Sequence, residues 1–271
     1  MAEKGWESQE FADTWKKKAA ERRTLMHAQT EAMFDAAGVR PGSRVLELGT
    51  GTGDTALLAG ERVGAQGSVL ATDFSPSMVQ AAKDVLREAG TANVTVRQMD
   101  GSAIDVEPGT FDAVIARQVL MFLDRARAFA GILRALKGGG RLSAVVWGPI
   151  NQNPFHGLAI AEGRKRGGWN PDDPPQVVRA FAINEEGAWT TWLAQAGFVD
   201  VTENVVRGER RFASPEAAFE AMRESPIHAD PIERLGEREK EEAWVELRRV
   251  CEEYGGVFPT VHLVLSARKA E

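Results

Sequence analysis

Residues 44–56, Arg-Val-Leu-Glu-Leu-Gly-Thr-Gly-Thr-Gly-Asp-Thr-Ala, decide the fold of this 271-residue chain. The apolar run at 45–48 predicts a buried strand. Gly49, Gly51 and Gly53 follow it, and they let the backbone turn sharply and approach a ligand closely. The helix expected next would direct its N-terminus at that ligand. The stretch therefore predicts a cradle for a nucleotide cofactor.

The spacing of these glycines narrows the class of ligand. The dinucleotide fingerprint is G-x-G-x-x-G, with a pyrophosphate on the N-terminus of the following helix. This chain has the shorter G-x-G-x-G, and Glu47 precedes it. The spacing disfavours an NAD-dependent oxidoreductase, which stays as the less favoured alternative.

Composition and charge exclude several classes of protein. With 43% hydrophobic residues, the chain can bury a full core as one elaborated domain or two small ones. Its charged first residues and the absence of a long apolar stretch argue against secretion and membrane spans, so we expect a soluble, cytoplasmic protein. A net charge of −6 argues against nucleic acid as a partner.

The sequence offers little for metals or disulfides. Cys251 is the single cysteine, which excludes an internal disulfide and a cysteine-rich metal site. The four histidines lie far apart without H-x-x-x-H pairing, so no metal site is expected. A basic cluster at 16–23 is interpreted as a solvated helix face.

Apolar strands alternate with amphipathic helices between residues 45 and 147, which predicts an α/β fold with a doubly wound, mostly parallel sheet. The expected strands are 44–48, 68–72, 94–98, 111–116 and 141–147. The expected helices are near 54–63, 76–90 and 125–137. The glycine run at 138–140 is expected to end the last of these helices.

Outside this region the sequence predicts helical additions to a seven-stranded, Rossmann-like sheet whose last strand is antiparallel. In such sheets ligands lie beyond the carboxyl ends of the strands, so we expect three helical pieces to cover that edge as a lid. The expected segments are an N-terminal helical lid at 1–38, a cofactor-binding α/β core at 39–148, an insertion at 149–184, more core at 185–206, a helical lid at 207–256 and a terminal strand at 257–271.

Asp73 ends the expected second strand, 20 residues past Gly53. Its carboxylate can accept hydrogen bonds from both hydroxyls of a ribose. Such an acid also occurs in NAD-binding folds, so it indicates a nucleoside cofactor without deciding which one. Alternatively, Asp73 has only a structural role as the N-cap of the next helix, but Ser75 can fill that role at least as well. Phe74 and Met78 offer apolar surfaces for an adenine, or belong to the core.

Two further stretches follow the third and fourth strands. Asp100 can accept from an adenine amino group, and the Gly101 amide can meet a ring nitrogen, although Asp-Gly is also a common turn. Ser102 follows this pair. Arg117 and Gln118 come after the fourth strand, at the expected amino-acid end of the cofactor.

Together these motifs resemble the class I S-adenosylmethionine (SAM) methyltransferases, and most closely the ubiquinone and menaquinone methyltransferases. The resemblance covers about 40–148 strongly, and rests on the order and spacing of 47–53, Asp73, 100–101, 111–112 and 136–142. Gly138 stands where the family usually has proline. The stretch 116–118 also departs from the quinone enzymes, so their substrate does not carry over.

The resemblance implies SAM as cofactor and S-adenosylhomocysteine as product, with a role for each motif. Glu47 would fix the methionine ammonium, directly or through water, and the turn with Gly49, Thr50, Gly51 and Gly53 would wrap the amino-acid portion. Asp73 would bind the ribose hydroxyls. The adenine would be recognised by Asp100, Gly101 and Ser102, beside Phe74 and Met78. Arg117 and Gln118 would contact the cofactor largely through backbone groups.

The sequence does not reveal catalytic residues. The sulfonium of SAM is already a good leaving group, so alignment of the acceptor with the methyl group can supply much of the rate without a dedicated acid or base. If the acceptor must lose a proton, the weak candidates are His27, His156 and His228, since histidine titrates near neutrality. An apolar acceptor pocket, or simply core, could include Trp6, Trp15, Met121, Phe122, Trp147, Phe155, Trp169, Phe181 and Phe219.

The leading hypothesis is therefore transfer of a methyl group from SAM, by in-line displacement, to carbon, nitrogen or oxygen of a small, partly apolar molecule. The alternative from another class is a protein of the same fold that binds SAM or S-adenosylhomocysteine without transfer. The expected partner is the small-molecule acceptor, with the chain as a monomer or homodimer.

Overall fold

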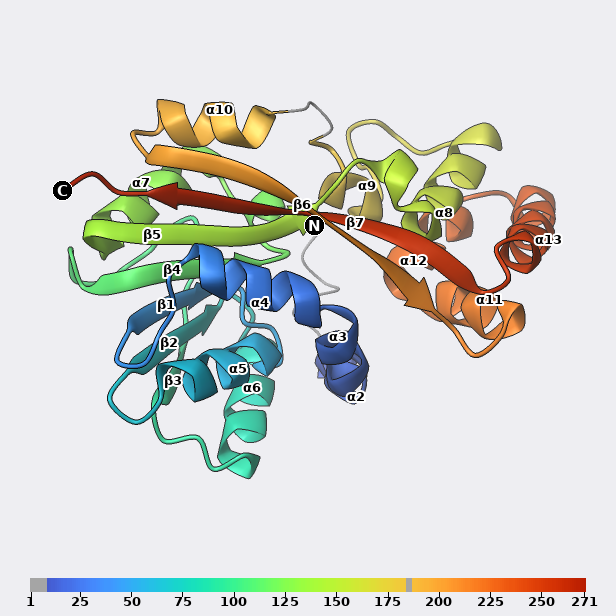
Figure 1. Ribbon diagram of the computed structural model, residues 1–271. Coiled ribbons are helices and arrows are strands. Elements are labelled where there is room, and N and C mark those ends of the chain that lie inside the picture. Colours follow the sequence, from blue (N-terminus) through green and yellow to red (C-terminus); the bar gives the residue numbers. More distant parts are fainter. Residues whose placement is uncertain (1–8, 184–186) are drawn as a thin grey trace. The chain divides into compact units, whose positions relative to one another are not determined.

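The computed structural model describes residues 9–183 and 187–271, which form two compact units (Figure 1). The first, here the sheet unit, is drawn from Met1–Val146, Glu186–Asn204 and Leu263–Glu271. The second, here the helical unit, is drawn from Trp147–Glu185 and Val205–His262. The expectations for Trp6 and for the segment boundary at 184–185 lie outside the described residues.

The described strands form one seven-stranded sheet in the order β3-β2-β1-β4-β5-β7-β6. They are β1 (Arg44–Leu48), β2 (Ser68–Asp73), β3 (Val94–Gln98), β4 (Phe111–Arg117), β5 (Leu136–Trp147), β6 (Val199–Arg211) and β7 (Val257–Arg268). The first five pair in parallel, with β1 between β2 and β4. This order confirms the predicted Rossmann-like fold.

The last strand runs against its neighbour β5, as expected (Figure 1). The Gly139 amide donates to the Lys269 carbonyl at 3.1 Å, and the Ser143 hydroxyl donates to the Leu265 carbonyl at 2.8 Å. The residue numbers of the partners therefore rise on one strand as they fall on the other, which defines antiparallel pairing.

Helices cover both faces of the sheet (Figure 1). Those of the sheet unit are α2 (Gln9–Lys17), α3 (Ala19–Leu25), α4 (His27–Ala36), α5 (Asp54–Val63), α6 (Pro76–Glu88), α7 (Arg125–Ala135) and α10 (Ala188–Gln195). Side-chain caps fix two of their starts. The Ser75 hydroxyl accepts from the Met78 amide at 3.3 Å, and the Asp124 carboxylate accepts from the Arg127 amide at 3.1 Å.

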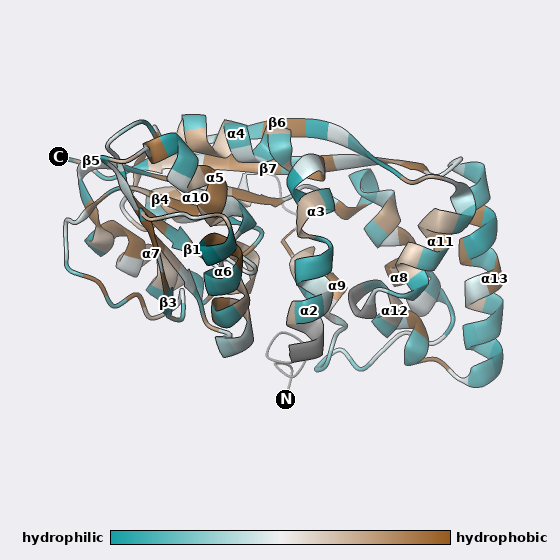
Figure 2. Ribbon diagram, turned by 90° about the horizontal axis from the view of Figure 1, so that it is seen from below, coloured by the Kyte–Doolittle hydropathy of each residue, from teal (hydrophilic) through white to brown (hydrophobic). Residues whose placement is uncertain are grey.

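The central strands are buried on both faces, which is why they read as nearly continuous apolar runs. Leu46, Leu48, Ile115 and Leu142 are completely inaccessible to solvent. In Figure 2 the outer strand β6 and the surface helices alternate between teal and brown. The core of the sheet unit therefore lies on the strands that carry the glycine turn.

The prediction that glycines 138–140 end a helix is wrong. Helix α7 ends at Ala135, and the glycines lie within β5. Gly139 has a φ of +72°, and the pairing of β4 with β5 shifts register between Phe111 and Ala113. The backbone freedom of glycine is used for a strand irregularity here, in place of a helix cap.

The helical unit has its own core. Its helices are α8 (Pro154–Lys165), α9 (Gln176–Ala180), α11 (Pro215–Arg223), α12 (Pro226–Glu233) and α13 (Glu237–Glu253). The buried cluster comprises Phe155, Ala159, Ala218, Phe219, Met222, Ile232, Ala243, Leu247, Cys251 and Phe258. Helix α13 is mostly teal in Figure 2, so only one stripe of it packs inward. None of the described helices is long and apolar enough to cross a bilayer.

Candidate functional site

The carboxyl ends of β1, β2 and β4 meet at one edge of the sheet, as parallel pairing requires. Glu47 of β1 lies beside Ala71 of β2 and Ile115 of β4. The Thr50 amide donates to the Thr72 carbonyl at 2.8 Å, which ties the glycine turn to β2. The register therefore brings the predicted cofactor residues of three strands to one edge.

The glycine turn needs glycine for two separate reasons. Gly49, Gly51 and Gly53 all have positive φ, at 67°, 55° and 84°, a region that side chains disfavour. In addition, a Cβ on Gly49 would lie 2.6 Å from Cγ2 of Val119. The turn is thus both left-handed and in close contact with the segment that follows β4.

Glu47 is a buried carboxyl group with little to balance its charge. It is 1% exposed, accepts one hydrogen bond from the Thr50 hydroxyl at 2.9 Å, and forms no ion pair with any residue that the structure describes. Burial raises its pKa to about 8, against the smaller opposing effects of Thr50 and the charge of Arg117. The site therefore disfavours ionised Glu47 unless a cation lies beside it.

Asp73 is buried too, but backbone amides balance it. Its Oδ2 accepts from the Gly51 amide at 2.9 Å, and its Oδ1 accepts from the Ser75 amide at 3.0 Å. Burial still raises its pKa above the ordinary value. Because the carboxylate holds the turn directly, it links β2 to the glycine loop across 22 residues of sequence.

Asp54, the first residue of α5, is held between two arginines that the sequence did not single out as its partners. Its Oδ1 accepts from Arg22 at 3.0 Å, and its Oδ2 accepts from Arg117. Burial alone would raise the pKa of Asp54, but Arg117 and Arg22 outweigh it and hold the pKa below its usual value. The Arg117 side chain is therefore committed to Asp54 and to the Thr30 hydroxyl, at 3.1 Å.

The N-terminal helices lie against the glycine turn. The Arg22 guanidinium lies 4.6 Å from the Trp15 ring centroid and donates to the Thr52 hydroxyl at 2.8 Å. The Trp15 indole nitrogen is 3.5 Å from where a Cβ on Gly51 would stand. The interpretation of 16–23 as a solvated face is thus wrong for Arg22, whose partner Asp54 lies too far away in sequence to be recognised.

The adenine-side candidates form a short turn after β3. The Asp100 carboxylate accepts from the Ser102 amide at 2.8 Å, and the Ser102 hydroxyl accepts from the Asp124 amide at 3.0 Å. A Cβ on Gly101 would lie 2.9 Å from Leu123. Asp100 itself is exposed, so the turn leaves its carboxylate accessible.

The two apolar candidates differ in accessibility. Phe74 is 40% exposed, which is unusual for a large apolar ring, whereas Met78 is 2% exposed and belongs to the core. Only Phe74 presents a ring that a planar ligand can cover.

Gln118 has the most unusual environment at this edge. Its φ is +62°, one of two such values among described residues other than glycine. Its side-chain oxygen and nitrogen are both buried without a hydrogen-bond partner among the residues described. Such orphaned groups are costly and are found where a ligand or water completes them. The sequence predicted mainly a backbone role for Gln118, so this amide was missed.

The three histidine candidates fall in different places. His27 is exposed on α4 of the sheet unit. His156 and His228 are 9% and 6% exposed, and they hydrogen-bond each other within the helical unit at 2.7 Å. The structure brings together two candidates that lie 72 residues apart in sequence.

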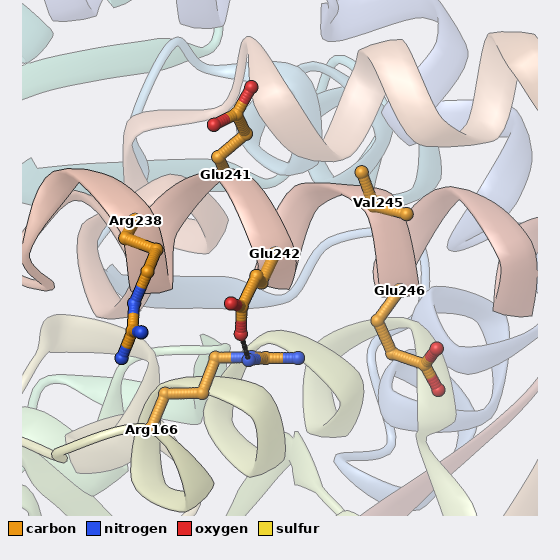
Figure 3. Close-up of a pocket in the computed structure, with 6 residues that line it drawn as sticks. All are labelled: Arg166, Arg238, Glu241, Glu242, Val245 and Glu246. Carbon is orange, nitrogen blue, oxygen red and sulfur yellow. Dashed lines mark hydrogen bonds and ion pairs between the residues drawn. The ribbon is translucent and has the colours of Figure 1, made fainter.

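Two surface pockets lie elsewhere. Figure 3 shows one of about 490 Å³ in the helical unit, lined by Arg166 and by charged residues of α13. Arg166 and Glu242 pair at 2.6 Å and neutralise each other. The other, of about 530 Å³, includes Asp112 and Lys137 near the amino ends of the strands. Neither contains a predicted site residue. No cluster of metal ligands occurs in the described part.

Comparison with known proteins finds similarity over the segment that carries this arrangement. A family model described as a methyltransferase domain matches residues 45–140. The ubiquinone/menaquinone biosynthesis C-methyltransferase UbiE of Idiomarina loihiensis is 37% identical over 111 residues, which cover 40% of this chain and 44% of that protein. The match spans less than half the length of this curated relative.

Solved structures show the same fold. The YcgJ protein of Bacillus subtilis aligns over 90% of this chain and 99% of its own, with a TM-score of 0.62 and 18% identity. A phosphoethanolamine N-methyltransferase of Haemonchus contortus, solved with S-adenosylhomocysteine, covers 99% of this chain and 60% of its own, with a TM-score of 0.60 and 17% identity.

These comparisons show that residues 45–140 are similar to a methyltransferase domain. The glycine turn, Glu47, Asp73, 100–101 and 117–118 all lie within the matched segment. Arg22 and the three histidine candidates lie outside it.

The buried Asp54 should make Arg117 important for stability. We predict that Arg117→Met lowers the free energy of unfolding by about 3 kcal/mol, because it leaves a buried carboxylate short of charge. Arg249→Met is the control, since Arg249 pairs only on the exposed face of α13 and should change little. Urea denaturation of both variants measures the difference, and equal values would contradict the role given to Arg117.

Proposed function

We propose that the chain is a methyltransferase that transfers the methyl group of SAM to a small, partly apolar molecule at carbon, nitrogen or oxygen. The observation that carries the proposal is Glu47, a buried carboxyl beside a left-handed glycine turn that forms no ion pair with any described residue. SAM carries a positive sulfonium and an ammonium group and no phosphate, so a short loop beside an acid suits it.

Different residues at this edge of the sheet would contact different parts of SAM. Glu47 would bind the ammonium, and the turn at Gly49, Thr50, Gly51 and Gly53 would surround the amino-acid portion. Asp73 would accept from the ribose hydroxyls with the lone pairs that the backbone amides leave. The adenine would meet Asp100, Gly101 and Ser102 beside Phe74.

The amino-acid end has a further candidate in the Gln118 amide. Its oxygen and nitrogen gain partners if a polar ligand group reaches them. Arg117 would act through its backbone and through Asp54, because its guanidinium is already paired with that carboxylate. The site thus supplies its polar contacts from β1, β2, β3 and β4.

Catalysis would depend on alignment. SAM supplies an activated methyl group when bound, and the chain would hold the acceptor in line with it and exclude water. Such positioning contributes about 7–11 kcal/mol in favourable cases. A general base is required only if the acceptor must lose a proton, and the candidates remain His27, His156 and His228.

The experiment that tests the function is incubation of the full chain with methyl-labelled SAM and a fractionated metabolite extract. We expect label in a small-molecule product together with stoichiometric S-adenosylhomocysteine. Binding of SAM with no transfer to any fraction would instead support a SAM-binding protein without catalysis.

Asp73 provides a test of the ribose contact. We predict that Asp73→Ala weakens SAM binding by about 2–4 kcal/mol, since each hydrogen bond to a charged group contributes about 1.5–3 kcal/mol. The control is Asp112→Ala, whose carboxylate binds the Arg44 amide at 2.8 Å near the start of β1, away from the site. Calorimetric titration measures both affinities, and an unchanged affinity for Asp73→Ala would remove Asp73 from the site.

Glu47 makes SAM binding depend on pH. The free protein holds Glu47 largely protonated at neutral pH, because its pKa is about 8. A bound cation lowers that pKa, so binding should release a proton from Glu47, and this contribution to affinity should grow as pH rises toward 8.

The proton count is obtained from binding enthalpies measured in buffers of different ionisation enthalpy. The α-amino group of SAM has a pKa of about 8, so the titrations are made at about pH 6, where this group is already protonated in solution and stays so in both complexes. The difference between the natural chain and Glu47→Gln therefore isolates Glu47. Identical proton release in the two proteins would show that Glu47 does not bind the cation.

A further inference from the structure

Helix α13 of the helical unit has one buried face and one outward face. Ala243, Leu247 and Cys251 are its buried residues and pack into the core of the unit. Successive residues of a helix turn by about 100°, which places a different set of side chains on the opposite face. This set, here the outer stripe, is exposed throughout and comprises Arg238, Glu241, Val245, Arg249 and Glu252.

Val245 lies at the centre of the outer stripe. Helix α13 runs Glu237–Glu253, so Val245 is also its middle residue. Its side chain is 67% exposed, the highest value among the large apolar residues that the structure describes. A single exposed valine is common on protein surfaces. What distinguishes Val245 is the arrangement of charge around it.

The charges on the two sides of Val245 are opposite at matching positions. Glu241 lies four residues before it and Arg249 four residues after it, whereas Arg238 and Glu252 lie seven residues before and after it. In two antiparallel helices related by a two-fold axis at Val245, positions equally far before and after this residue face each other. Glu241 would therefore face Arg249 of the second copy, and Arg238 would face Glu252.

The side chains of the outer stripe can form these pairs. Neither Glu241 nor Glu252 forms an ion pair with a residue that the structure describes. Arg238 pairs with Glu239 at 3.0 Å, and Arg249 pairs with two glutamates of its own helix. A guanidinium has five N–H donors, so each arginine can bind a further carboxylate.

A shallow hollow lies beside the outer stripe. It has a volume of about 490 Å³ and lies between Arg166 and α13, with Arg238, Glu241 and Val245 at its border (Figure 3). Packed helices interdigitate, with the side chains of each in the grooves of the other. The hollow therefore offers room for side chains of a second helix.

We propose that the outer stripe binds a second copy of this chain, with the two α13 helices antiparallel about a two-fold axis at Val245. The interface contains two pairs of Glu241 with Arg249, two pairs of Arg238 with Glu252, and one contact between the valines. A parallel arrangement would place like charges opposite each other, so the charge pattern selects the antiparallel one. The proposal goes beyond methyl transfer and does not depend on it.

The composition of the outer stripe determines the strength of this contact. Exposed ion pairs contribute little individually, and one pair of helices is small beside the interface of about 1,600 Å² that is typical of stable complexes. Salt screens exposed charges. We therefore expect a reversible dimer that dissociates on dilution and at high salt.

The test is sedimentation equilibrium of the full chain over a concentration series at low salt. Glu241→Arg and Arg249→Glu each place like charges opposite each other twice, so each should weaken dimerisation about tenfold. The variant with both changes has opposite charges again, with the signs exchanged, and should recover the dissociation constant of the natural chain. The single changes alter the net charge in opposite directions, so a general effect of net charge would not weaken both.

Glu107→Arg is the matched control, because it makes the same charge change at an exposed position of the sheet unit. It should dimerise like the natural chain, and circular dichroism checks that each variant is folded. Three results would each overturn the proposal. They are a natural chain that stays monomeric over the whole series, an unchanged dissociation constant in either single variant, and a double variant that dimerises no better than the single ones.

A cysteine at Val245 locates the axis, and this measurement holds even if a charge-reversal variant does not fold. A residue on a two-fold axis meets its own copy, so air oxidation should join two Val245→Cys chains by a disulfide. The natural Cys251 can stay, because it is completely buried and burial raises the pKa of its thiol to about 11.

Val205→Cys is the control for random collision, since Val205 is 51% exposed and lies on β6, away from α13 in sequence. It should cross-link about tenfold more slowly than Val245→Cys, because a disulfide requires the two Cβ atoms to approach closely. Equal rates for the two variants would show that the axis does not pass Val245, and would overturn the proposal.

Discussion

Three carboxyl groups are buried around one glycine turn, and the way each is balanced organises the sheet unit. Glu47, Asp54 and Asp73 are 1%, 4% and 7% exposed. Burial of a charge is costly unless ion pairs or hydrogen bonds compensate it. Asp73 is compensated by backbone amides and Asp54 by two arginines, whereas Glu47 keeps a raised pKa. Of the three carboxyl groups, Glu47 is thus the one whose burial is not compensated. A cationic ligand beside it would supply the missing compensation.

The compensation of Asp54 also explains how the N-terminal helices are held. Arg22 comes from α3, Arg117 from the end of β4, and Asp54 from the start of α5. One ion-pair cluster therefore joins three segments at the edge that carries the predicted cofactor residues. Trp15 therefore lies beside the turn and Thr30 beside Arg117, although neither residue belongs to a recognisable motif.

Local sequence predicted the parts of the fold that depend on local rules. The bounds of β1, β3 and α5 are as expected, since apolar runs and turn residues determine them. The glycine run at 138–140 was misread because glycine tolerates both helix caps and strand irregularities, and only the pairing with β4 decides between them.

Long-range pairs could not be predicted. Arg22 lies 32 residues from Asp54, and His156 lies 72 residues from His228. Basic and histidine residues of a helix read as surface unless their partners are known. The sequence could offer candidates for the cofactor site because glycine turns and strand ends recur at fixed spacing, whereas the acceptor side has no such local pattern.

The most direct test of the account is a pair of calorimetric titrations of the full chain, one with SAM and one with NAD. Glu47 and the short glycine loop predict saturable binding of SAM and no binding of NAD. The pyrophosphate of NAD is negatively charged, and the loop would place it beside the acidic side chain of Glu47. Tight binding of NAD with no binding of SAM would contradict the account.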